Sequence, residues 1–107
     1  MLKITLAVAY VVAMLASSAV MAADDNAMRD AHRKMDQQMQ AGMENSGSAD
    51  ERFVRMMIPH HQGAVDMSRL ALPDIKDAEL RRMAEKTMRE NEKEIQDMQA
   101  WLKKHNK

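Results

Sequence analysis

The chain has 107 residues, of which 16 are basic and 16 acidic, and it contains no cysteine. This length allows one small domain, and the missing cysteines exclude a disulfide framework and thiolate metal ligands. The balanced charge argues against nucleic acid as a partner, because no face carries a concentrated positive charge. Methionine is abundant, with 13 residues, and its thioether suits either adaptable core packing or the binding of a soft metal.

The first 22 residues have the composition of a secretory signal peptide. Lys3 precedes an apolar run over residues 4–16, and small residues follow it. The run is shorter than the ~20 residues that a membrane-spanning helix needs. Val20 and Ala22 favour cleavage after Ala22, and an uncleaved membrane anchor is the alternative. We therefore expect an exported, periplasmic chain of residues 23–107 with no stable membrane association.

Residues 23–47 are expected to form a helix rich in methionine and histidine, followed by a flexible joint. The helix is predicted over residues 26–40, and Gly42, Gly47 and two serines mark the joint. Residues 33–45 have no leucine, isoleucine, valine or aromatic residue to pack with, which favours metal binding over core packing for their sulfurs. Five candidate ligands lie here at helical spacings: Met28, His32, Met35, Met39 and Met43.

Residues 48–107 are assigned to a helical-bundle domain that starts with a second helix. Ser48 and Glu51 form a capping pattern just ahead of the apolar residues, and the sequence Leu72-Pro73 ends the helix. The apolar face is wide, so this helix should be the buried centre of the domain. One stripe comprises Phe53, Met57, His60, Ala64, Met67 and Ala71, and its neighbour comprises Val54, Ile58, His61, Val65 and Leu72.

A third helix is predicted over residues 77–104, with charged residues on its outer face. No strand-like alternation is present, so the fold class is all-α, an up-down bundle of three helices. The apolar core of such a short chain is small, and we expect a homodimer to complete it. The inward stripe comprises Leu80, Ala84, Met88, Asn91, Ile95, Met98 and Leu102.

The run MMIPHHQGAVDM at residues 56–67 places two methionine–histidine pairs side by side. Met56 precedes His60 by four residues, and Met57 precedes His61 by four, so each pair shares one side of a helix. Adjacent histidines point about 100° apart, and each is expected to join a group from a neighbouring helix. Thioethers favour Cu(I), while imidazole accepts Cu(I) and Cu(II). With Met67 and the five N-terminal candidates, these four residues complete a predicted copper-ligand set of ten.

Packing explains part of this pattern equally well. Met57 and Met67 lie on inward stripes and favour a core role. His60 and His61 are also compatible with half-buried rings satisfied by a carboxylate or a backbone carbonyl. Pro59 is expected to kink the helix or to start a new turn, and to free a carbonyl near Arg55 that could orient an imidazole.

A resemblance to a known family rests on two stretches, FVRMMIPHHQGAVDM and LRRMAEKTMRENEKEIQDMQAWL. Over residues 50–102 the chain resembles the domain of unknown function 305 family, except that Asn91 stands where the family usually has glutamine. The resemblance implies a ferritin-like bundle and a role like that of the CopM-type periplasmic proteins, which are tied to copper tolerance. By the motif, Met57, His60, His61 and Met67 would bind the metal. Residues 23–47 lie outside this resemblance.

The function predicted from these observations is copper binding, for sequestration or transfer. The sequence offers no catalytic arrangement: no Glu-x-x-His pair, no His-Glu-x-x-His and no nucleophile with a base, so we do not expect an enzyme. The alternative is a metal-independent periplasmic helper whose methionine-rich surface holds other proteins.

Overall fold

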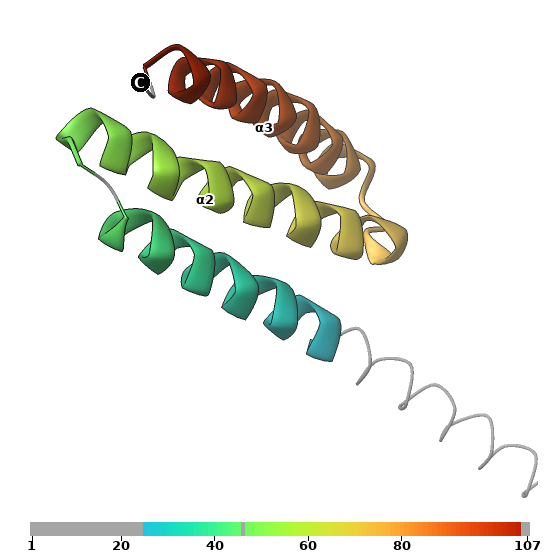
Figure 1. Ribbon diagram of the computed structural model, residues 1–107. Helices are drawn as coiled ribbons and strands as arrows, with labels where there is room; N and C mark the ends of the chain where they lie inside the picture. The colour runs from blue at the N-terminus through green and yellow to red at the C-terminus, as the bar shows by residue number, and fades with distance from the viewer. Residues whose placement is uncertain (1–24, 46, 106–107) are drawn as a thin grey trace, which may run out of the picture.

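Three helices make up the computed structural model, which describes residues 25–45 and 47–105 (Figure 1). Residues 25–44 form the N-terminal helix. Helix α2 spans Ala49–Ala71, a short 3-10 turn, η1, spans Leu72–Asp74, and α3 spans Ala78–His105. These residues contain no strand, so the predicted all-α up-down bundle is confirmed. The signal peptide predicted over residues 1–22 lies outside the described residues.

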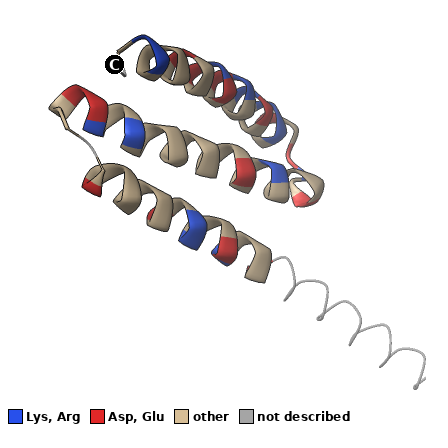
Figure 2. Ribbon diagram, in the orientation of Figure 1, with Lys and Arg blue, Asp and Glu red and all other residues tan. Residues whose placement is uncertain are grey.

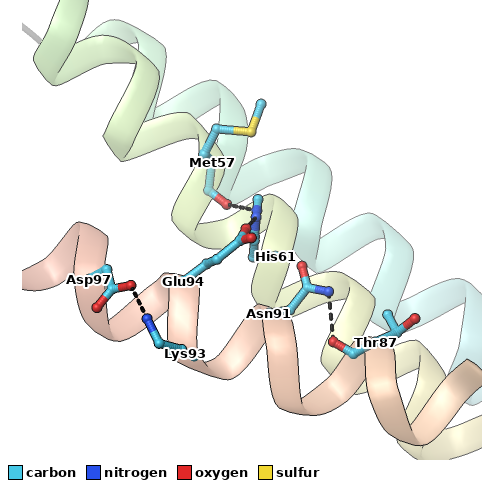
Figure 3. Close-up of polar contacts among 7 residues, drawn as sticks. All are labelled: Met57, His61, Thr87, Asn91, Lys93, Glu94 and Asp97. Carbon is cyan, nitrogen blue, oxygen red and sulfur yellow. Dashed lines mark hydrogen bonds and ion pairs between the residues drawn. The ribbon is translucent and has the colours of Figure 1, made fainter.

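The three helices lie side by side, with α2 between the N-terminal helix and α3 (Figures 1 and 3). Residues 53–67 of α2 therefore meet two different partners on opposite sides of one helix. The capping pattern at the start of α2 is confirmed. Ser48 Oγ accepts a hydrogen bond from Glu51 N at 3.1 Å. The Arg55 guanidinium donates to Glu51 Oε1 at 2.7 Å and lowers the pKa of that carboxyl below its ordinary value.

Helix α2 continues through Pro59 without a break, so the proline does not start a new element. It ends at Ala71, close to the predicted boundary, because Pro73 leads into the 3-10 turn. Helix α3 then begins under a side-chain cap, in which Leu80 N donates to Asp77 Oδ1 at 2.8 Å.

The N-terminal helix is longer than predicted, and Gly42 lies inside it rather than in a joint. A Cβ at Gly42 would stand 2.4 Å from the carbonyl oxygen of Arg55, so this glycine allows two backbones to touch. Pro59 has no N–H to donate to that carbonyl. Seven residues earlier, the Met35 thioether packs on Gly63, where a Cβ would stand 2.3 Å from the sulfur. The two contacts fix an antiparallel register between the N-terminal helix and α2.

The core is thin. Among the described residues, the only apolar side chains that are buried belong to Val54, Val65 and Ile95. Val54 and Val65 come from the second of the two predicted stripes, which faces α3. No residue of the first stripe is fully buried: Phe53, at 57%, and His60 are exposed, and the other four residues are partly buried. Leu80 was predicted to point inward and is 53% exposed, because it lies in the first turn of α3, beyond the end of α2.

Replacing Gly42 with alanine tests the close contact of the backbones. The new methyl group would meet a backbone oxygen that cannot move aside, so we expect a loss of about 1–3 kcal/mol in the free energy of unfolding, as for overpacked cores. Gly47→Ala is the matched control, because a Cβ there meets only Glu51 Oε2 at 3.5 Å. Urea denaturation of both variants measures the difference, and equal stability of the two would show that the N-terminal helix does not dock through Gly42.

Candidate metal centre

The seam between the N-terminal helix and α2 brings predicted ligands together. The register set by Gly42 and Gly63 aligns the two helices along their length. One surface hollow on this seam gathers two thioethers and one imidazole from residues more than thirty positions apart in the chain. The residues that line it are Met28, Arg29, His32, Arg33, Asp36 and Met67.

His32 is held in an orientation that suits a ligand. Its Nδ1 lies 3.3 Å from Asp36 Oδ2, one turn further along the helix. A carboxylate beside one imidazole nitrogen fixes the tautomer and leaves the other nitrogen for a metal. No other contact of the ring is found among the described residues, so Nε2 stays available. The side chain is 60% exposed, which keeps it accessible to an incoming ion.

The donors in the hollow are soft and uncharged. Met28 and Met67 supply thioethers, which prefer Cu(I), and His32 supplies an imidazole. Arg29 and Arg33 also line the hollow, so the local charge does not attract a cation. A metal ion would have to be selected by its preference for soft donor atoms. In residues 25–45 and 47–105, no three His, Cys, Asp or Glu side chains are grouped so that they could hold a metal ion. The hollow itself is lined by two thioethers, one imidazole and the Asp36 carboxylate.

The same register gives a second group of donors further along the seam. Met39 follows Met35 by four residues and comes level with Pro59, while Met43 comes level with Arg55. Met56 and His60 lie on the same turns of α2. Met39 and Met56 are partly buried, and Met43 and His60 are exposed. Met35 lies between the two groups, where its sulfur packs against Gly63.

His61 has a different environment, on the side of α2 that faces α3 (Figure 3). Its Nδ1 lies 2.9 Å from the carbonyl oxygen of Met57, and its Nε2 lies 2.5 Å from Glu94 Oε2. Since a carbonyl can only accept, Nδ1 carries a hydrogen, and both ring nitrogens are occupied. The side chain is 16% exposed. His61 therefore matches the packing alternative given in the sequence analysis, a half-buried ring whose nitrogens are paired with a carboxylate and a backbone carbonyl.

The predicted pair of Met57 and His61 meets through a backbone atom and not through sulfur. Figure 3 shows the Met57 thioether pointing away from the His61 ring. His60, in contrast, is exposed, and its ring centroid lies 5.9 Å from that of His61. The two adjacent histidines thus divide, one toward solvent and one toward α3.

Two carboxylates near the candidate ligands were not singled out in the sequence. Asp36 had a local signal, since it follows His32 by one helical turn. Glu94 had none beyond its place in the family motif, because 33 residues separate it from His61. Only the packing of α2 on α3 reveals that contact.

The fold and the donors define a small helical protein with thioether and imidazole groups gathered between two helices. The family model of the domain of unknown function (DUF305) matches residues 8–102, and the chain belongs to this family. The match includes the N-terminal helix, which the motif resemblance had left outside. Comparison with curated proteins finds no match. None of the helices in the described part of the chain is long and apolar enough to cross a membrane.

Removing the Glu94 carboxylate tests the bridge between α2 and α3. Glu94→Ala removes the partner of His61 Nε2, and we expect the free energy of unfolding to fall by about 1 kcal/mol, a modest value because Glu94 is 61% exposed. Glu85→Ala, on the exposed face of the same helix, controls for helix propensity. Thermal denaturation of the two variants gives the comparison, and an equal effect of both would mean that the bridge does not stabilise the fold.

Proposed function

We propose that this protein is an exported, periplasmic copper-binding protein that sequesters or transfers Cu(I) through methionine and histidine side chains. The observation that carries the proposal is the hollow on the seam, which Met28 and His32 line from one helix and Met67 lines from another. Within this proposal the bundle is ferritin-like, the role is that of the CopM-type members of the family, and the mature chain is a homodimer.

Donor chemistry favours copper over other metals. Thioethers are poor ligands for hard cations and good ligands for Cu(I), and imidazole supports both oxidation states of copper. The second group of donors, with Met39, Met56 and His60, has the same character. A copper ion needs no additional charged ligand to be held by such groups.

Exposure of the donors supports exchange of copper rather than permanent storage. His32 is 60% exposed, so a receiving protein can reach the metal while it is still partly bound. A closed site would have to open before release. Within this proposal, transfer is therefore the better supported of the two tasks.

A Cu(I) competition titration with a coloured chelator tests the hollow as a ligand site. Met67→Leu keeps the volume of the side chain but removes its sulfur, and His32→Ala removes the imidazole. We expect each to weaken Cu(I) binding by about tenfold or more, in the range seen when metal-site residues are changed. Met88→Leu on α3 and His105→Ala near the C-terminus are matched controls and should change affinity by less than about twofold. Equal effects of ligand and control variants would contradict the proposed site.

Copper should also stabilise the fold, because ligands from two helices converge only in the native state. Binding to the folded chain alone adds about 2.7 kcal/mol at a free-ligand concentration of 100 times Kd. We expect the melting temperature of the mature chain to rise with Cu(I), and the rise to shrink in a His32→Ala, Met67→Leu double variant. A melting temperature that is the same with and without Cu(I) would argue against a copper site in the native state.

The helper class remains a second candidate, and a specific observation favours it. Phe53, Leu80 and Met83 are each more than half exposed, and such residues can hold other proteins. A helper would suppress the aggregation of an unfolded client with no copper present, whereas a copper carrier would not. An aggregation assay in a copper chelator separates the two.

A further inference from the structure

Helix α2 has two sides that neither neighbouring helix covers, and they differ in character. Its contacts with the N-terminal helix pass through Gly63, and its contacts with α3 pass through Val54, Val65 and His61. One remaining side carries the polar pairs Glu51–Arg55 and Gln62–Asp66. The other carries the stripe of Phe53, Met57, His60, Ala64, Met67 and Ala71, which has no charged member.

The neighbouring helices extend this side of α2 with both apolar and charged residues. Met67 shares the hollow with His32, and Met43 follows His32 by eleven residues, or about three turns, on the same side of the N-terminal helix. On α3, Glu94 reaches His61, and Met83 precedes Glu94 by eleven residues. The name apolar face is used for the apolar residues on this side, among which the charged Asp36 and Glu94 also lie: Met43, Phe53, Met57, Ala64, Met67, Ala71, Leu80 and Met83.

Its exposed members make the apolar face conspicuous. Phe53 and Met83 are each 57% exposed, Leu80 is 53% and Met43 is 50% exposed. Figure 2 shows that the middle of α2, between Arg55 and Asp66, carries no charged residue, whereas charges run along α3. Four of the five large apolar side chains that are most exposed in the described residues belong to this one face; the fifth is Leu70.

The face is large enough for a stable interface. A helix of 23 residues is about 34 Å long at 1.5 Å per residue, and three helices about 9 Å apart give a width of about 28 Å. The resulting outline of the whole side of the three helices, charged residues included, is about 950 Å², which is similar to the ~800 Å² that each partner contributes to a typical specific interface.

Folding itself indicates which partner covers the face. With only three buried apolar side chains among the described residues, a single copy has little core to hold its helices together. A partner that supplies the missing burial has to be present whenever the chain folds, and a second copy always is. The mature chain lacks Lys3 and carries 15 basic and 16 acidic residues, a formal net charge of −1, so two copies repel each other only weakly.

We propose that two mature chains pair face to face through the apolar face, with the α2 stripes of the two copies in contact. This inference rests on the homodimer in the proposed function and specifies its surface, but it does not need copper.

Sedimentation of the mature wild-type chain in the presence of a copper chelator tests the pairing separately from metal binding. We expect the mass of a dimer at micromolar concentration, and a melting temperature that rises with protein concentration. A folded monomer at every concentration would leave the face to a different partner and overturn the proposal. Failure of the copper titration would leave this result untouched.

Substitutions then locate the interface. Phe53→Lys and Met83→Lys should each weaken dimerisation by about tenfold or more, while Gln96→Lys, exposed on the polar side of α3, should have no effect. A dimer that all three variants form equally well would overturn the proposal.

A crosslinking experiment covers the case in which the lysine variants fail to fold. The natural chain has no cysteine, so a single Ala64→Cys substitution places one thiol on the apolar face, and Gln96→Cys places one away from it. With a short bismaleimide, we expect the first variant to form covalent dimers and the second to remain monomeric on a denaturing gel. Equal crosslinking of both, or of neither, would overturn the proposed surface.

Discussion

The close approach of the N-terminal helix to α2 is the constraint on which the candidate metal centre depends. Gly42 lets the backbone of one helix touch the Arg55 carbonyl of the other, and Gly63 receives the Met35 thioether. Any side chain larger than hydrogen at Gly42 would push the helices apart. The separation of the helices sets how far apart the sulfur of Met67 and the imidazole of His32 lie, so the donor group exists only as long as the helices touch.

Proline and glycine cooperate at this contact. Pro59 has no N–H, so the Arg55 carbonyl lacks its usual partner within α2, and Gly42 comes against this same oxygen. The proline thus does not break the helix. Because of the proline, a neighbouring backbone can come close to α2 at the Arg55 carbonyl. This contact lies about one helical turn before the exposed His60.

Much of the fold could be predicted from the sequence, because its signals are local. The capping pair of Ser48 and Glu51 and the Leu72-Pro73 stop are short-range features, and they placed the ends of α2 within a residue or so. Gly42 was misread as part of a joint, since a glycine that ends a helix and one that allows close packing look alike in a single sequence. The contact that distinguishes them is made with Arg55, in a different helix.

The candidate site was predicted less completely, for the same physical reason. Helical spacing selected Met28, His32 and Met67 as candidate donors but could not say that they would line one hollow, because that depends on the register between helices. Spacing also paired Met57 with His61, whereas the histidine turns to Glu94 on α3. The periodicity of a sequence predicts which residues share one side of a helix. Which other helix packs against that side is determined by the tertiary structure.

The division of labour within the double histidine affects how variants of this motif are read. His61 joins two helices through both ring nitrogens, while His60 keeps its ring in solvent. Replacing both histidines together would therefore remove a candidate donor, His60, and would also weaken the contact between α2 and α3 that His61 makes. Loss of metal from such a variant would not identify a ligand, whereas changing the two positions one at a time would keep coordination chemistry and structural integrity apart.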